Sequence, residues 1–227
     1  MVREEIVKML IWSRRLLIRA AAGSVVLCLA LISPARAEVN CQEVSASPYN
    51  PPGRVCASGL PSDLLQIPAV SDHQHQSQWC WAASISMVFS YYGHPVSQER
   101  IVRETYGYIV NMPAQPWTML GALNRSWVDD QGQPFQSMSS PGSTNPVAAA
   151  QDLAMNMPLI IGTLGHAVVL TGLQYAANYM NTPLGPQLGP VFITRAVVRD
   201  PWPGRGSREL SSGEWPSISF AVQIRVE

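Results

Sequence analysis

The chain is poor in lysine and poor in charge of either sign. Lys8 is the only lysine among 227 residues, and charged residues make up 13% of the chain. The 15 basic and 15 acidic residues balance, and the arginines form no basic stripe. Because proteins that bind nucleic acids concentrate positive charge on one face or along one helix, we expect no nucleic-acid partner.

The chain also lacks the common cofactor motifs. It contains no Walker phosphate loop, no dinucleotide-binding glycine fingerprint, no internal repeat and no heptad pattern. Asp72, His73 and His75 suggest a zinc site with Cys80 nearby, but no second cysteine or acidic cluster completes a set of ligands. We therefore expect neither a cofactor nor a metal.

Long apolar runs are scarce, and the clearest one is near the N-terminus. It extends from Ala20 to Ile32, which is shorter than the roughly 20 residues that a membrane-spanning helix needs. Arginines precede it, and Ala35-Arg36-Ala37 follows as a small-residue cleavage site. This pattern predicts a secretory signal over residues 1–37, cleaved near Ala37/Glu38. The alternative is an uncleaved membrane anchor.

Removal of this signal would leave about 190 residues, a length that suits one domain with a substantial core. We expect a Pro-rich arm over residues 38–70, a single domain over residues 71–227, no stable membrane association after cleavage, and a monomer. Export would bring the chain to the periplasm or the outside of the cell. The absence of lysine after Lys8 fits arginine-biased codon use, or alternatively delivery into a host or competitor cell.

Three cysteines follow the predicted signal: Cys41, Cys56 and Cys80. Cys41 and Cys56 are 15 positions apart in a segment rich in proline, serine and glycine. Since export implies an oxidising compartment, we expect these two to form a disulfide. Cys80 is then the odd cysteine, and an unpaired thiol in an exported protein suggests a reactive role.

Cys80 stands between Trp79 and Trp81 at the start of a helix-like pattern. Apolar residues recur at helical spacing after it, and Gly93 follows as a C-terminal cap. At a helix N-terminus, unpaired N–H groups and the positive end of the dipole favour the thiolate, which is the reactive form. The other interpretation is an inert buried cysteine.

Three further residues complete a candidate constellation. Gln74, six residues before Cys80, carries an amide that could stabilise an oxyanion, although Gln76 and Gln78 compete for this role. His166 is the one histidine in an apolar, strand-like run, and Asp200 stands where a later strand-like run ends. Each has a structural alternative: His166 as a core histidine bonded to a carbonyl, and Asp200 as a cap for the turn at Pro201.

The segments Gln74–Ala83, Gly165–Val169 and Asp200–Trp202 together resemble the bacterial papain-like cysteine peptidases. That group includes staphopain-like secreted enzymes and a plant-pathogen effector peptidase. The resemblance implies that the helix bears the cysteine and that an antiparallel sheet bears the histidine. It implies that Cys80 is the nucleophile and His166 the general base. It also implies that Asp200 orients the imidazole and that Gln74 is the oxyanion donor.

The same resemblance suggests which residues line a substrate cleft between helix and sheet. These are Trp79, Trp81, Gly165 and Trp202. The expected activity is hydrolysis of a protein or peptide substrate by a secreted cysteine peptidase. One alternative keeps the nucleophile in a deamidase, cell-wall amidase or transpeptidase. The other is a binding module with a dead site.

The remaining pattern predicts an α+β fold, with helices first and strands second. Expected helices are 80–92, 98–106 capped by Ser97, 116–127 with Trp117, Leu120 and Leu123 on one face, and 146–156 capped by Asn145. Expected strands are 158–163, 166–175, 190–199 and 218–226. We expect an extended arm or short pro-segment before residue 71, a turn at 129–132, a surface loop at 136–144, and a long connection at 176–190.

Overall fold

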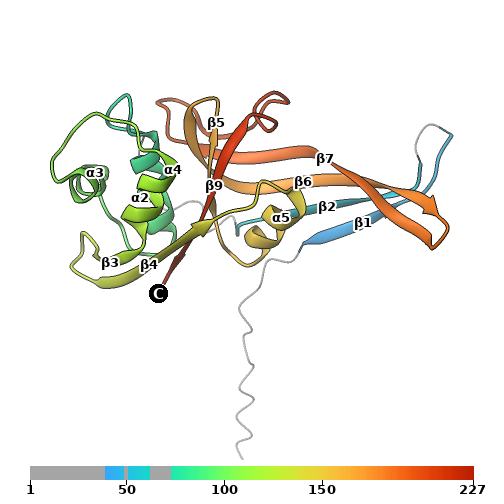
Figure 1. Ribbon diagram of the computed structural model, residues 1–227, viewed down its shortest axis with the longest axis horizontal. Coiled ribbons are helices and arrows are strands. Elements are labelled where there is room, and N and C mark those ends of the chain that lie inside the picture. The colour runs from blue at the N-terminus through green and yellow to red at the C-terminus, as the bar shows by residue number, and fades with distance from the viewer. Residues whose placement is uncertain (1–38, 49–50, 62–72) are drawn as a thin grey trace, which may run out of the picture. The chain divides into compact units, whose positions relative to one another are not determined.

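A nine-stranded antiparallel sheet and four helices form the part of the chain described by the computed structural model, residues 39–48, 51–61 and 73–227 (Figure 1). The predicted signal at residues 1–37 lies outside the described residues. The helices are α2 (Cys80–Tyr91), α3 (Gln98–Tyr106), α4 (Pro116–Leu123) and α5 (Pro146–Ala154). The strands are β1 (Asn40–Val44), β2 (Gly53–Gly59), β3 (Arg125–Val128), β4 (Pro134–Pro141), β5 (Leu159–Thr163), β6 (His166–Thr182), β7 (Gly185–Asp200), β8 (Gly206–Glu209) and β9 (Ile218–Val226). The predicted α+β class is confirmed.

The long strand β6 organises the sheet. The strand order is β1-β2-β6-β5-β9-β4-β3, and β7 pairs with β6 on one side and β8 on the other. Along one edge, β6 pairs first with β5 and then with β2, while β7 pairs along nearly its whole length. Every pairing is antiparallel, as the sequence predicted.

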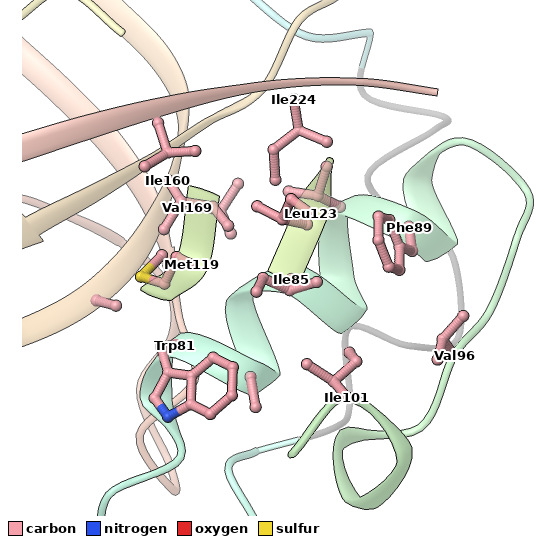
Figure 2. Close-up of a cluster of buried hydrophobic side chains, with 14 of the residues drawn as sticks. Trp81, Ile85, Phe89, Val96, Ile101, Met119, Leu123, Ile160, Val169 and Ile224 are labelled. Atoms are coloured by element: carbon pink, nitrogen blue, oxygen red, sulfur yellow. The ribbon is translucent and has the colours of Figure 1, made fainter. Parts of the chain in front are cut away.

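The central strands are buried on both faces. Because successive side chains of a strand point to opposite sides, Ile160 of β5 and Val169 of β6 belong to the buried cluster that also contains side chains of α2, α3 and α4 (Figure 2). Their neighbours Ile161 and Val168 pack on the other face with α5. Two-sided burial explains why the sequence around β5 and β6 is continuously apolar and does not alternate.

Helix α2 enters the core on the first of these faces. Ile85 and Phe89 are fully buried against α3, α4 and the sheet (Figure 2). The helix ends at Tyr91 with Tyr92 as its C-cap, and Gly93, which was expected to be the cap, follows in the left-handed region with φ of 86°. The buried Ser84 hydroxyl donates to the carbonyl of Ala167 at 3.3 Å, which ties α2 to the start of β6.

Two helix predictions needed correction. The helix at 98–106 has the expected bounds, but the Ser97 side chain makes no capping hydrogen bond. The helix that begins at Pro116 ends at Leu123, because the chain then turns into β3, which pairs with β4. Its buried side chains are Met119 and Leu123, whereas Trp117 is 71% exposed.

No helix among the described residues is long and apolar enough to cross a membrane.

Three segments for which no strand was expected contain strands in the structure. The arm contributes β1 and β2, residues 136–141 belong to β4, and residues 176–190 lie mostly within the β6–β7 hairpin. The polar or proline-rich composition of these segments hid this, because strand pairing is made by backbone groups that the side-chain pattern does not show. Asn145 does cap α5 as predicted, since its Oδ1 accepts from the N–H groups of Val147 and Ala148.

The described residues thus have the papain-like arrangement that the resemblance implied. The helix that begins with Cys80 packs on an antiparallel sheet that carries His166 and Asp200.

The predicted disulfide joins Cys41 of β1 to Cys56 of β2, which face each other in the register of the two strands. Cys56 is buried, and β2 in turn pairs with β6. We expect the double variant Cys41→Ser/Cys56→Ser to lose about 3 kcal/mol of unfolding free energy, because a 15-residue separation constrains the unfolded chain by about that amount. Denaturant unfolding of the oxidised wild type and the variant measures this loss. Equal midpoints would show that the bond adds no stability.

Candidate functional site

Three elements bring Cys80, His166 and Asp200 to one place. Cys80 is the first residue of α2, His166 is the first of β6, and Asp200 is the last of β7. Because β6 and β7 run antiparallel with Val169 opposite Arg199, the start of one strand lies beside the end of the other.

A tight turn sets the position of His166. Leu164 and Gly165 connect β5 to β6 with φ angles of 50° and 77°. Two consecutive left-handed residues are the signature of a two-residue type I′ hairpin, whose twist matches that of the strands it joins. The turn pairs His166 with Thr163, so the histidine is held at the first position of β6, an interior strand of the sheet.

The imidazole of His166 lies between the other two side chains. Its Nε2 is 2.6 Å from Oδ1 of Asp200, and the ring also forms a hydrogen bond with the sulfur of Cys80. Since Nε2 faces the carboxylate, Nδ1 is the nitrogen available to the sulfur. Trp202 approaches the ring edge-on, with 6.0 Å between the ring centroids.

These contacts shift the pKa of both Cys80 and His166. Burial alone would raise the pKa of Cys80, but hydrogen bonds from His166 and from the backbone of Ala167 outweigh it, so the thiol pKa is lowered. Burial alone would lower the pKa of His166, but the bonds to Asp200 and Cys80 raise it to about 9. Both shifts favour a thiolate paired with an imidazolium.

Asp200 is held by more than His166. Burial opposes its charge, yet the His166 bond, the Trp202 N–H at 2.9 Å and the Arg208 guanidinium at 2.7 Å lower the pKa of the carboxyl. A second arginine, Arg205, approaches Oδ2 at 3.4 Å. Arg208 also forms a two-point ion pair with Glu214. The carboxylate is therefore ionised and fixed on both oxygens.

Gln74, the expected oxyanion donor, directs its amide into its own loop and does not line the cleft that contains Cys80. Its Nε2 donates to the carbonyls of Gln76 and Ser77, each at 3.0 Å, and its backbone N–H donates to Pro201 at 2.7 Å. The side chain is buried, and its Oε1 has no hydrogen-bond partner among the described residues. An oxyanion would have to compete with these two carbonyls for one amide hydrogen.

Hydrogen bonds from Gln98 of α3 and from Asn111, in the loop after α3, hold the same loop in place. Gln98 at the start of α3 accepts from the N–H of His75 and donates to the carbonyl of His73, each at 3.0 Å. Asn111 accepts from the N–H of Gln78 at 2.9 Å. These polar clamps fix the chain that leads into Cys80, and nothing in the sequence pattern predicted them.

The sequence suggested His73 and His75 as zinc ligands. In the structure the Nδ1 of His75 is 2.6 Å from Oε1 of Glu99. Within residues 39–48, 51–61 and 73–227, no three His, Cys, Asp or Glu side chains are grouped as metal ligands would be.

A cleft of about 330 Å³ opens beside Cys80 and His166. Apart from these two, its walls carry no ionisable side chain, and they consist of Trp81, Pro113, Ala114, Gln115, Pro116, Trp117, Gly162, Gly165, Ala167, Ser219 and Phe220. Gly162 is required for close packing, since a Cβ there would lie 2.0 Å from the Phe220 ring.

Of the four residues expected in the cleft, Trp81 and Gly165 line it. Trp79 does not, because it is buried in the core and its indole N–H donates to the carbonyl of Val110 at 2.8 Å. Trp202 is 45% exposed and contacts the side of the His166 ring without lining the cleft.

Sequence reasoning missed two groups of residues at the site. The exposed Trp117 and the ring of Phe220 were taken as helix and strand positions, and only the packing of α4 and β9 around Cys80 reveals them as walls. Arg208 and Glu214 lie on a short strand and a turn that no periodic pattern marked. A buried carboxylate needs a cationic or hydrogen-bonding partner, but the burial of Asp200 is known only from the folded chain.

The chain has counterparts among known proteins. The family described as Peptidase_C39 like family matches residues 64–216. The peptidase domain of Streptococcus ComA, described as a bi-functional ABC transporter involved in a quorum sensing pathway, is a structural neighbour with a TM-score of 0.41 and 13% sequence identity. That match covers 68% of this chain and 95% of the ComA domain. No curated protein matches the chain.

Proposed function

Because the chain belongs to the Peptidase_C39 like family of papain-like cysteine peptidases, we propose that it hydrolyses peptide bonds, with Cys80 as nucleophile and His166 as general acid and base. The family supports the wider class that the resemblance implied, and it does not support the staphopain-like group specifically. The observation that carries the proposal is the His166 ring, which is hydrogen-bonded to the Cys80 sulfur on one side and to Asp200 on the other.

The reaction begins with the thiolate of Cys80 attacking the carbonyl carbon of the substrate. His166 gives its proton to the leaving amine as the C–N bond breaks, which leaves a thioester on the sulfur. Water then attacks the thioester while His166 takes up one of its protons. The acid leaves, and the thiolate–imidazolium pair returns.

Asp200 acts on the imidazole and does not exchange protons with the substrate. Its lowered pKa keeps it ionised, so it stabilises the cationic ring and fixes the tautomer that presents Nδ1 to the sulfur. The backbone N–H of Cys80, at the N-terminus of α2, is one oxyanion donor. Gln74 is the second, exchanging a bond to Gln76 or Ser77 for the oxyanion.

We place the reaction outside the cytoplasm. The Cys41–Cys56 bond supports this, because structural disulfides persist mainly in oxidising compartments. A protein or peptide with apolar side chains near the cleaved bond suits the uncharged walls of the cleft.

The products of the reaction test the proposal. Wild-type protein and Cys80→Ala, each mixed with a peptide library, should differ by new α-amino termini that mass spectrometry detects only with the wild type. Ammonia release from glutamine peptides without chain cleavage would instead identify a deamidase. Joined peptides would identify a transpeptidase, and cleavage confined to cell-wall fragments would identify an amidase. An unchanged library would contradict peptide hydrolysis.

A further inference from the structure

Two of the four hydrogen bonds that the Asp200 carboxylate accepts come from arginine side chains. Oδ1 accepts from His166 and from the N–H of Trp202, while Oδ2 accepts from Arg208 at 2.7 Å and from Arg205 at 3.4 Å. The Asp200 side chain has no exposed surface, and the Arg208 side chain is 21% exposed. The contact with Arg208 is thus shorter and less hydrated than the contact with Arg205, which is 53% exposed.

Arg208 is itself held in place by Glu214. Its two terminal nitrogens lie 3.0 and 2.6 Å from the two carboxylate oxygens of Glu214, a two-point geometry that fixes the plane of the guanidinium. Glu214 also accepts from the N–H of Ser211, and its backbone carbonyl accepts from Thr163 of β5, each at 2.7 Å. A continuous set of polar contacts therefore connects β5, through Glu214 and Arg208, to Asp200.

We propose that Arg208 and Glu214 are positioning residues that fix Asp200 against His166 and set the pH range in which Cys80 is reactive. This inference rests on the proposed function. The charged groups that face the His166–Asp200 pair are Cys80 from α2, Arg205 from the turn after β7, Arg208 from β8, and Glu214 from the turn before β9.

The two residues have opposite electrostatic effects. The positive charge of Arg208 disfavours protonation of the cysteine–histidine pair, and the negative charge of Glu214 partly cancels that charge. Loss of Arg208 should therefore raise the pKa values of the pair, and loss of Glu214 should lower them. A merely structural role would give loss of activity without opposite shifts.

The test is the rate of Cys80 alkylation by iodoacetamide as a function of pH. We expect the acidic limb to move up by about one pH unit in Arg208→Gln and down by about half a unit in Glu214→Gln. The double variant should return toward the wild-type profile, because it removes both charges. Arg208→Lys should keep the wild-type limb but lower kcat about tenfold with KM little changed, since one ammonium cannot hold both carboxylates.

Arg195→Gln is the matched control. Arg195 forms a 2.6 Å pair with Glu209 across the same two strands, but both side chains are more than half exposed and neither contacts Asp200. Its alkylation profile should equal that of the wild type. Should Arg208→Gln fail to fold, the downward shift in Glu214→Gln tests the proposal alone.

Shifts in the same direction, or wild-type profiles in both single variants, would overturn the proposal. Because alkylation needs no peptide substrate, this result is separate from the test of function. Opposite shifts without peptide hydrolysis would refute the peptidase and leave the support of Asp200 standing. Peptide hydrolysis with unshifted alkylation profiles would support the peptidase and refute the role of Arg208 and Glu214.

Discussion

Replacing Cys80 with alanine should abolish peptide hydrolysis and leave the fold intact. The loss should be on the order of 10⁵-fold or more, because removing the nucleophile removes the whole covalent route. Cys80 is partly exposed at the first position of α2, where alanine is a good helix former, and the neighbouring Trp81 and Ile85 supply the packing of that turn. Turnover of a cleavable peptide and the thermal midpoint of both proteins measure the two effects.

The variant Cys41→Ser/Cys56→Ser is the matched control for this prediction. It also removes cysteine sulfur atoms, those of the disulfide, but it leaves Cys80 as the free cysteine among the described residues. At a temperature where it is folded, it should hydrolyse the peptide at the wild-type rate. Retained activity in purified Cys80→Ala would show that Cys80 is not the nucleophile.

The candidate site was largely predictable because its residues stand at chemically distinctive points of the chain. Cys80 was the odd cysteine at a helix start, His166 was the histidine of an apolar strand, and Asp200 ended a strand before a proline. Each position follows from local pattern, and antiparallel pairing of β6 with β7 then brings two of them together.

The parts of the fold that were missed depend on partners distant in sequence. Half of the eight residues of β4 are glutamine or serine, and it is a strand because it lies between β3 and β9. β1 is exposed along its whole length and is held by its pairing with β2 and by the disulfide. Local sequence contains no trace of such pairings, since the backbone groups that form them are the same in every residue.

The same reason explains the missed support of Asp200. A carboxylate that is fully buried requires compensation, and the sequence indicates that need only if burial is known. Arg208 of β8 lies 8 positions beyond Asp200, and Glu214, in the turn before β9, lies 14 positions beyond it. Turns interrupt the chain after β7 and after β8, so no single helix or strand period relates these positions, and only the folded chain identifies the pair.

His166→Ala should remove both hydrolysis and the unusual reactivity of the thiol. In the wild type, the His166 hydrogen bond and charge lower the pKa of Cys80 against the effect of burial. Without the imidazole, burial remains and the thiol pKa should rise, so that alkylation begins at a higher pH than in the wild type. Hydrolysis should fall by about 10⁴-fold or more, because no group remains to protonate the leaving amine.

The lowered pKa of Cys80 and the raised pKa of His166 predict where the activity of the wild type rises and falls with pH. Hydrolysis should rise where the Cys80 thiolate forms, below the usual thiol range, and should fall as the imidazolium loses its proton toward about pH 9. The two limbs belong to the coupled pair and not to either residue alone. Iodoacetamide kinetics from about pH 4 to about pH 10 should show the low-pH limb in the wild type and not in His166→Ala.

His94→Ala is the matched control, since His94 also contacts a carboxylate, Asp129 at 3.0 Å, and stacks on Phe135, but does not line the cleft. Its alkylation profile should equal that of the wild type. If His166→Ala instead keeps the wild-type profile, then His166 does not activate Cys80. The thiolate would have to depend on the N-terminus of α2 and the backbone of Ala167 alone.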